Sequence, residues 1–360
     1  MKQQITIIGK IEGLSKIKEN ILQTEYNRFN VICQQVQQCV NNDIEPQYFW
    51  FKDKNTHASF VAEALMSIKK PFIKLNNQPL YLRKDVSRLE KQNENKKYKY
   101  WLKIPTKQRR HFWVAVNIPK YCENRLTDFT FCDSKIVKRN DEWYTHLVIE
   151  KEIKMITEYK DVLGVDLGIR RTASVVRLSD GMTRYYGKEI RNIRGHYFYL
   201  RKKLGEKKAN KTIKKIGQTE RRKVNDQLHK ISRKIVNMAK ETNSALVIGD
   251  LKGITKKKNN KGRKFNRKLS MMPFAKLSDY IKYKANLEGI QVVKVNEAHT
   301  SQTCNKCGKK GIRNKGLFKC KCSYDDNADR NGAINIAKRG LGEMSSSGVF
   351  VAMPRTGGSL

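Results

Sequence analysis

The chain has 360 residues and carries 75 Lys and Arg against 34 Asp and Glu, a formal net charge of +41. A hydrophobic fraction of 39% and an aromatic fraction of 9% exclude a wholly disordered basic tail, and the length predicts two or three domains. So basic a fold repels itself unless a polyanion binds, and nucleic acid is the natural partner because Lys and Arg release counterions from phosphates. Charge alone leaves ribosomal and basic membrane-surface proteins open, so it indicates a partner class and no activity.

The N-terminal part of the chain predicts a small β-domain interrupted by a helical one. Residues 4–9 form a strand-like apolar run, and residues 13–90 carry apolar side chains at helical spacing. From about 98 to 154 the apolar period changes to two, with a turn-like stretch at 138–141. Neither region contains a catalytic constellation, so both are candidates for holding the polyanion.

From about residue 160 the predicted strands and helices alternate, which favours an α/β layer on a mixed sheet. Strands are expected at 162–168 and 245–248, with long helices rich in Lys and Arg over 190–243 between them. A basic loop at 252–268 is expected to be mobile until an anion docks on it. Beyond it we expect a helix at 276–287, a strand at 290–295, a helix near 328–338 and a loosely ordered tail rich in Ser and Gly.

Asp166 lies inside the apolar run at 162–168. A buried, unpaired carboxylate is costly, so Asp166 should become neutral, pair with a cationic group or bind a metal ion. The glycines on either side would let backbone or ligand approach closely. The segment alone leaves open a simpler interpretation, in which Asp166 ends a strand and pairs with Arg170 or Arg171.

Asp329 is the second acid that stands out. On a helix it would share one face with Ala333 and Ile336, so it is either a helix-capping residue or a metal ligand. Asp326 and Asn327 could cap the helix and leave Asp329 free. In isolation, an ordinary aspartate stabilising the helix dipole remains the alternative.

Four of the eight cysteines fall within nineteen residues, and this is the strongest local signal in the sequence. The spacing is Cys304-x2-Cys307, then twelve residues, then Cys320-x-Cys322. Four thiolates in close pairs match a tetrahedral structural zinc site, although the second pair is one residue shorter than usual. The other four, Cys33, Cys39, Cys122 and Cys132, are expected to be ordinary reduced thiols.

Taken in order, the motifs resemble those of TnpB proteins, which are transposon-encoded relatives of Fanzor nucleases and type V CRISPR effectors. The resemblance covers roughly residues 160–340. It rests on Gly164-Val165-Asp166-Leu167-Gly168, Leu228-His229-Lys230-Ile231-Ser232, residues 245–251, Tyr283-Lys284-Ala285, residues 300–308 and residues 328–336.

This resemblance implies a multidomain protein of mixed α/β and β class. An RNase H-like RuvC nuclease domain with a zinc-ribbon insertion would follow a wedge β-barrel that carries a helical recognition insertion. The expected boundaries are 1–12 and 91–157 for the wedge β-barrel, 13–90 for the recognition domain, 158–299 and 326–340 for RuvC, 300–325 for the zinc-binding target nucleic-acid module, and 341–360 for a flexible tail.

The resemblance also implies the activity and the partners. A guide RNA from the transposon end would select target DNA by base pairing, and the protein would cut that DNA beside a short flanking motif. We expect a monomeric ribonucleoprotein in the cytoplasm, associated with the nucleoid. No apolar run reaches the length of about 18 residues that a membrane span needs, and the start of the chain reads as a strand rather than a signal peptide.

One departure from the family pattern concerns the acid on the middle strand. The usual Glu, followed by Asp-Leu, falls at Gly249 in Val247-Ile248-Gly249-Asp250-Leu251. Either the site is dead or another carboxylate fills the gap. Alternation along a strand turns Asp250 to the opposite face, whereas Glu297 lies at the end of the next predicted strand. Some TnpB and Fanzor proteins resemble this arrangement, so we expect a variant with a relocated RuvC glutamate.

The expected catalytic residues are therefore Asp166, Glu297 and Asp329, holding two Mg²⁺ ions for phosphodiester hydrolysis. Asp166 would bridge the ions, and the zinc at the cysteines would be structural. The alternative function is a nuclease-dead RNA-guided DNA-binding repressor. A DNA-strand-exchange transposase is a third hypothesis, for which the sequence offers no acid or Tyr nucleophile arrangement of its own.

Overall fold

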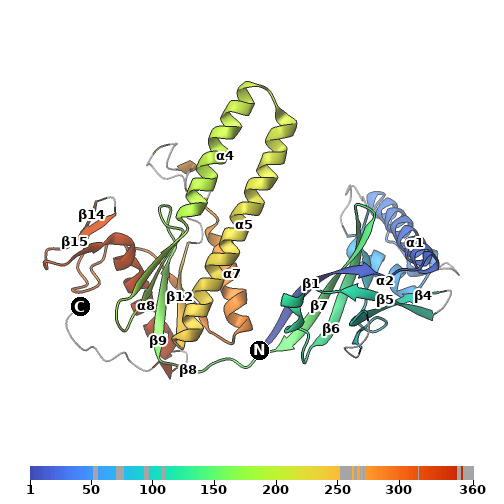
Figure 1. Cartoon of the computed structure of the whole chain (residues 1–360), viewed down its shortest axis with the longest axis horizontal. Coiled ribbons are helices and arrows are strands. Elements are labelled where there is room, and N and C mark those ends of the chain that lie inside the picture. The colour runs from blue at the N-terminus through green and yellow to red at the C-terminus, as the bar shows by residue number, and fades with distance from the viewer. Residues whose placement is uncertain are drawn as a thin grey trace. The chain divides into compact units, whose positions relative to one another are not determined.

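In a computed structural model the chain forms two compact units, Met1–Glu152 and Ile153–Leu360 (Figure 1). The basic loop predicted at 252–268 lies almost wholly outside the described residues. The structure describes residues 1–51, 56–69, 77–92, 97–107, 110–251, 262, 266–267, 269, 272–314, 316–346 and 350–351.

Unit 1 is built on a seven-stranded antiparallel sheet in the order β2-β6-β7-β1-β5-β4-β3. Alternate side chains of β1 are buried, as expected for a strand with one face on a core. Asn140 and Asp141 join β6 to β7 with φ of 49° and 60°, which confirms the predicted turn. The strands are β1 (Lys2–Glu12), β2 (Leu80–Leu82), β3 (Leu89–Lys91), β4 (Tyr100–Thr106), β5 (Arg110–Asn117), β6 (Thr130–Arg139) and β7 (Glu142–Glu152), with a short α3 (Lys120–Glu123) after β5.

The helical part of unit 1 consists of α1 (Lys16–Asn41), the 3-10 turn η1 (Tyr48–Trp50) and α2 (Ala58–Ser67). Ser15 caps α1, because its hydroxyl accepts a hydrogen bond from the Lys18 N–H. The expectation that the whole range 13–90 is helical was wrong at its end, since β2 and β3 pair with the sheet. Strands of three residues are too short to show a period of two.

Unit 2 contains a five-stranded sheet in the order β11-β10-β9-β12-β13. β9, β12 and β13 are parallel neighbours, while β10 runs antiparallel to both β9 and β11. All of β9 is buried, as is β12 apart from its last residue, so the mixed sheet predicted from the alternating pattern is confirmed. The bounds are β9 (Asp161–Asp166), β10 (Ala173–Arg177), β11 (Thr183–Tyr186), β12 (Ser244–Asp250) and β13 (Val292–Asn296).

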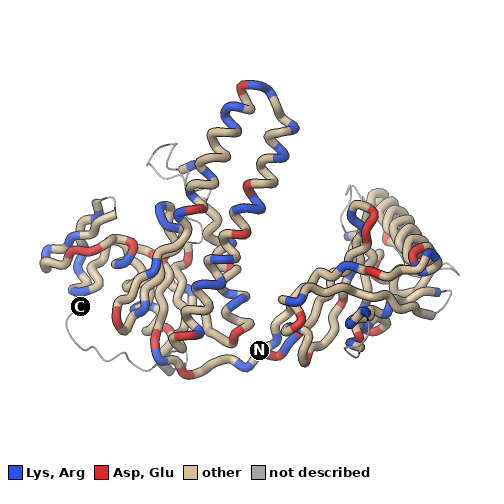
Figure 2. Tube along the Cα trace, viewed as in Figure 1, with Lys and Arg blue, Asp and Glu red and all other residues tan. Residues whose placement is uncertain are grey.

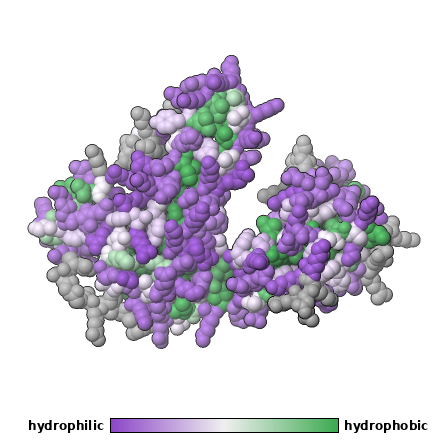
Figure 3. Space-filling model, in the orientation of Figure 1, coloured by the Kyte–Doolittle hydropathy of each residue, from purple (hydrophilic) through white to green (hydrophobic). Residues whose placement is uncertain are grey.

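Two long helices between β11 and β12, α4 (Lys188–Glu206) and α5 (Asn210–Glu241), form a hairpin that projects away from the sheet (Figure 1). The predicted apolar stripe of α5 is confirmed, with Leu228, Ile231 and Ile235 buried in the core of unit 2. Lys and Arg recur along both arms (Figure 2), and hydrophilic residues dominate the face of the hairpin seen in Figure 3.

The last two helices are α7 (Phe274–Leu287) and α8 (Ala328–Ser346). The loosely ordered tail expected from residue 341 was wrong for its first residues, because α8 continues through Ser346. Met344 explains this, since it is fully buried in the core of unit 2 and keeps the helix docked. Beyond it β17 (Phe350–Val351) pairs with β8 (Glu158–Tyr159). Within the described residues, no helix is both long and apolar enough to cross a membrane.

Candidate active site

The strand order brings the candidate acids to one edge of the unit 2 sheet. β12, which carries Gly249, lies between β9, which ends at Asp166, and β13, which ends just before Glu297. Gly249 pairs with Val295 and Asp250 with Asn296 in parallel register. Since the carboxyl ends of parallel strands share an edge, this order brings Asp166 and Glu297 together. The strand order expected from the departure at Gly249 is confirmed.

The carboxyl groups of Glu297 and Asp166 are hydrogen-bonded to each other across the middle strand. Gly249 makes this possible: a Cβ at that position would lie 2.7 Å from Oε2 and 2.9 Å from Cδ of Glu297. Both distances are shorter than ordinary van der Waals contacts of about 3.5–4.0 Å. The Glu297 side chain therefore occupies the space that a side chain at 249 would need.

Burial raises the pKa values of both of these acids. Removal from water, together with the neighbouring charges of Asp166 and Asp250, raises the pKa of Glu297 to about 9. Burial is also the main cause that raises the pKa of Asp166 to about 6, and the charge of Asp329 acts in the same direction. Oε2 of Glu297 is buried and has no hydrogen-bond partner within the described residues. Two carboxyls in this state are suited to sharing a proton or binding a cation.

Asp329 approaches the pair from the first turn of α8. Asn327 caps this helix, because its Oδ1 accepts hydrogen bonds from the N–H groups of Asp329 and Arg330 at 2.9 and 3.3 Å. As expected, Asn327 rather than Asp329 caps the helix, so the Asp329 carboxylate is available for other contacts. A Cβ on Gly332, one turn further, would lie 3.1 Å from Oδ2 of Asp166, so this glycine leaves space for the acid.

Arg313 is a residue at this site that the sequence did not indicate. Its Nη2 donates to Oδ1 of Asp329 at 2.9 Å, and the Asp329 side chain is only 14% exposed. The charge of Arg313 also lowers the pKa of Asp166, which opposes the effect of burial. Arg313 belongs to β14 (Ile312–Asn314), which forms a small antiparallel sheet with β15 (Leu317–Lys319) and β16 (Asp325–Asn327).

The four clustered cysteines come together as their spacing predicted. The sulfurs of Cys304, Cys307, Cys320 and Cys322 all lie within 4.8 Å of one another. Two of the pairs, Cys304–Cys322 and Cys307–Cys320, are 3.7 and 3.5 Å apart. Zinc bonded to sulfur at about 2.3 Å holds tetrahedral ligands about 3.8 Å from one another. The backbone N–H of Lys309 lowers the pKa of Cys307 to about 7, which favours the thiolate that binds metal.

Parts of the chain are similar to known proteins. Residues 274–336 match the family model described as "Cas12f1-like, TNB domain". The chain is 33% identical over 222 residues to the CRISPR-associated endodeoxyribonuclease Cas12f2 of a Micrarchaeota archaeon, covering 56% of this chain and 40% of that protein. It is 26% identical over 250 residues to the TnpB-like protein MJ0751 of Methanocaldococcus jannaschii, covering 66% of this chain and 90% of that protein. The chain is therefore similar to TnpB-like and Cas12f proteins.

A solved structure shares the fold of the chain. A solved cryo-EM structure of a Cas12f1–sgRNA–target DNA complex superposes with a TM-score of 0.63 at 16% identity, covering 90% of this chain and 82% of that one. The mixed α/β multidomain architecture expected from the sequence is therefore confirmed. The aligned part of this chain spans less than half of the Cas12f2 relative.

Two asparagines of the TnpB-like segment at 328–336 join α8 to the cysteine module. Asn331 is fully buried; its Nδ2 donates to the Thr303 carbonyl at 2.7 Å and its Oδ1 accepts from the Asn305 N–H at 3.0 Å. Nδ2 of Asn335 donates to the carbonyls of Thr300 and Thr303 at 2.8 and 2.7 Å. The helix that carries Asp329 is thus held directly to the loop that leads into the zinc ligands.

We expect one zinc per chain, and we expect Cys304→Ser to lose it. In small structural zinc domains the free energy of metal binding, on the order of 10 kcal/mol, stabilises the folded state. Without zinc, the segment around β14–β16 should therefore unfold locally. Elemental analysis and limited proteolysis measure the two effects. Cys39→Ser, which changes a half-buried thiol in unit 1, is the control and should keep its zinc. Well-folded wild-type protein without zinc would contradict the assignment.

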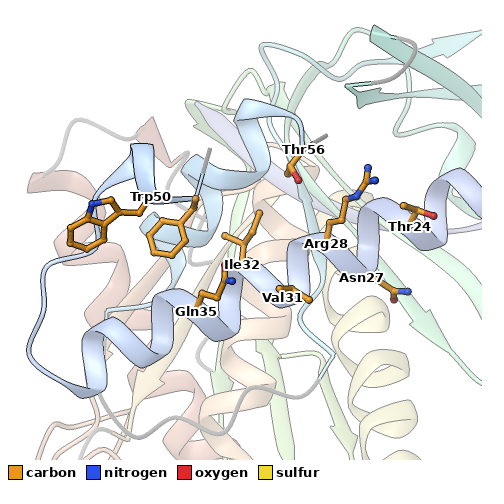
Figure 4. Close-up of a pocket in the computed structure, with 9 residues that line it drawn as sticks. Thr24, Asn27, Arg28, Val31, Ile32, Gln35, Trp50 and Thr56 are labelled. Atoms are coloured by element: carbon orange, nitrogen blue, oxygen red, sulfur yellow. The ribbon is translucent and has the colours of Figure 1, made fainter. Parts of the chain in front are cut away.

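Unit 1 has a separate pocket of about 460 Å³ along α1 (Figure 4). Trp50, which is 50% exposed, lies at one end of the pocket, and Arg28 of α1 lies toward the other. Thr56 also lines it; this residue is only 4% exposed, and its Oγ1 has no hydrogen-bond partner within the described residues. A ring, a guanidinium and an unsatisfied hydroxyl are groups that recognise an unpaired nucleobase.

Proposed function

We propose that this protein is an RNA-guided DNA endonuclease of the TnpB family whose carboxylates Asp166, Glu297 and Asp329 form the cleavage site. The observation that carries the proposal is the reach of Glu297 across Gly249 to Asp166, which supplies a third acid where the family's usual one is missing. The names of the relatives, a CRISPR-associated endodeoxyribonuclease among them, support the reaction class.

The residues present fit a divalent cation of the kind that prefers oxygen ligands. Three carboxyls converge, Oε2 of Glu297 is buried without a hydrogen-bond partner among the described residues, and burial and neighbouring negative charge raise the pKa values of Asp166 and Glu297. A cation at this point would offset that charge. Two Mg²⁺ ions held by the three acids would activate water and stabilise the leaving oxygen of a phosphodiester.

The chain itself contributes position, charge and exclusion of water. β9 and the segment after β13 hold Asp166 and Glu297 on a rigid sheet, and Arg313 balances the charge of Asp329 at 2.9 Å. Burial of Asp166, which is 8% exposed, keeps bulk water away from the acids. The raised pKa values mean that the Asp166–Glu297 pair would hold a proton. The pair would release this proton when a cation binds.

The remaining parts of the chain would hold the nucleic acids. We assign guide RNA and flanking-motif contacts to unit 1, as the wedge barrel and the helical recognition insertion, and target strand contacts to the cysteine module. Guide–target base pairing would supply sequence specificity, while Lys and Arg contact backbone phosphates. We propose that the protein acts as one copy on one guide RNA.

Cleavage by the reconstituted complex tests the function. The protein is co-expressed with the genomic sequence that flanks its gene, the bound RNA is sequenced, and Mg²⁺ is added with target DNA carrying randomised flanks. We expect cutting next to one short motif and none in the presence of a chelator. Stable, guide-dependent binding to target without any cutting would instead establish the repressor, for which the glycine at position 249 is the specific argument.

We also expect the protein to purify with RNA and to bind it in a strongly salt-dependent way. With a formal net charge of +41, many Lys and Arg contacts release counterions, so affinity should fall by orders of magnitude between about 50 and 200 mM salt. Absorbance ratios during purification and filter binding at several salt concentrations measure this. Protein that is soluble, monomeric and free of nucleic acid at low salt would contradict it.

A further inference from the structure

A second pocket of about 440 Å³ lies in unit 2 against α4, which we call the α4 pocket. Four arginines, two aromatic residues and a glycine make up most of its lining. These residues are Arg170, Arg191, Arg194, Arg267, Phe198, Tyr199 and Gly195. Positive charge and rings in one concave site form the combination that binds nucleic acid.

Arg194 is the unsatisfied group in this pocket. Its Nε is buried and has no hydrogen-bond partner within the described residues. Glu220 is ion-paired to Arg201. Burial lowers the pKa of Arg194; the charge of Glu220 opposes this effect, and the charge of Arg201 adds to it. A guanidinium with an unsatisfied donor suits an anion that offers several acceptor oxygens, and a phosphate is such an anion.

The aromatic residues indicate a single strand rather than a duplex. Tyr199 is 67% exposed, and the Phe198 ring lies 4.0 Å from the Arg267 guanidinium carbon in a cation–π contact. An exposed ring such as that of Tyr199 beside arginines is a platform on which an unpaired base stacks, whereas the bases of a duplex are already stacked on one another.

The chain links the α4 pocket to the acids. Ile169 and Arg170 line the pocket and follow Asp166 by three and four residues. Arg170 also extends toward the cysteine module, since a Cβ on Gly316 would lie 2.9 Å from its Nη1. A strand bound in the pocket would therefore continue toward Asp166 with only a short span between.

We propose that the α4 pocket binds a backbone phosphate and an adjoining base of the single-stranded DNA that enters the carboxylate site. This inference rests on the proposed function, because it takes the strand to be the one that is cut. Arg194 acts as a positioning residue: it holds the strand in place and does not touch the reacting phosphate.

Two variants test the α4 pocket in the guide-loaded full-length protein. Arg194→Gln removes the charge and the fork of donors. Gly195→Phe fills the pocket without changing charge, and the backbone should accept it because a Cβ at 195 meets nothing within 4 Å. Gly195→Ala is the matched control. Arg194→Lys keeps the charge but lacks the planar fork that contacts a phosphate through two donors.

We expect Arg194→Gln and Gly195→Phe each to weaken binding of a fluorescent 12-nucleotide single-stranded DNA by about tenfold, the effect of losing one charge-assisted contact or one stacked base. Arg194→Lys should fall between wild type and Arg194→Gln, and Gly195→Ala should match wild type. Cleavage should slow by a similar factor at low DNA concentration and recover as DNA saturates, while target binding through the guide is unchanged.

The outcomes separate this inference from the proposed function. If wild-type protein cuts DNA and both variants bind the oligonucleotide and cut as wild type does, the α4 pocket inference is wrong and the function stands. If wild-type protein never cuts but both variants lose single-strand affinity, the pocket binds DNA and the nuclease proposal fails. If Gly195→Phe lowers the melting temperature, the result for Arg194→Gln alone tests the α4 pocket. This substitution should not destabilise the fold, because the buried Nε of Arg194 has no hydrogen-bond partner within the described residues.

Discussion

Glu297→Ala is expected to abolish DNA cleavage while leaving guide-RNA and target binding close to wild type. In the proposed site Glu297 supplies the acid that position 249 lacks, since its side chain lies over Gly249 and interacts with Asp166. Loss of a metal ligand should lower the cleavage rate by more than the 10- to 100-fold typical of an outer-shell partner, so we expect at least about 100-fold. Single-turnover cleavage and gel-shift binding measure the two properties separately.

Matched variants make this prediction sharp. Asp166→Ala and Asp329→Ala should behave like Glu297→Ala, and so should Glu297→Gln, which keeps the shape and removes the charge. Asp250→Ala should keep measurable activity, because successive residues of a strand face opposite sides of the sheet, so Asp250 points to the face opposite that of position 249. If Glu297→Ala cuts at the wild-type rate and Asp250→Ala is inactive, Asp250 is the ligand and the assignment of Glu297 is wrong.

Moving the acid back to the middle strand should restore cleavage in a Glu297→Ala protein. The added change is Gly249→Glu. The position accepts a side chain once Glu297 is shortened, since the atoms within 3.1 Å of a Cβ at 249 are all in the Glu297 side chain, at or beyond Cγ. Gly249 also has no positive φ that would favour glycine. We expect the double variant to regain at least about tenfold over Glu297→Ala, which is part of the loss that removing a ligand causes.

The control for this exchange is Gly249→Gln in the same Glu297→Ala background. It fills the space equally but brings no charge, so it should stay inactive. Equal recovery with Gln would mean that packing rather than a carboxylate was restored. No recovery with Glu would mean that side chains at 249 and 297 do not place their carboxylates at the same point.

The parts of the site that the sequence predicted are those set by short-range spacing or by strand order. The four cysteines needed only their own spacing, and Glu297 followed from a gap at Gly249 together with the order of three strands. Arg313 could not be predicted in this way. It lies in a short strand with no pattern of its own, and its contact with Asp329 depends on how the small sheet packs on α8.

The same division holds for the fold. Long amphipathic segments such as α5 were predicted correctly because nine buried residues repeat on one face. β2 and β3, of three residues each, were missed because pairing with distant strands makes them strands. The end of α8 was missed as well, since a Ser- and Gly-rich segment lacks helical propensity and is held by burial of Met344.

The outer turns of the α4–α5 hairpin are a place where the chain could be shortened or lengthened. From Tyr197 to Glu220 no residue between the two is buried, so the tip contributes nothing to the core. An α-helix repeats about every 3.6 residues, so removing two whole turns from each arm would return the chain along nearly the same path. A compact version of the protein, or one carrying a fused effector domain, could be engineered at this tip without moving the strands that bear the acids.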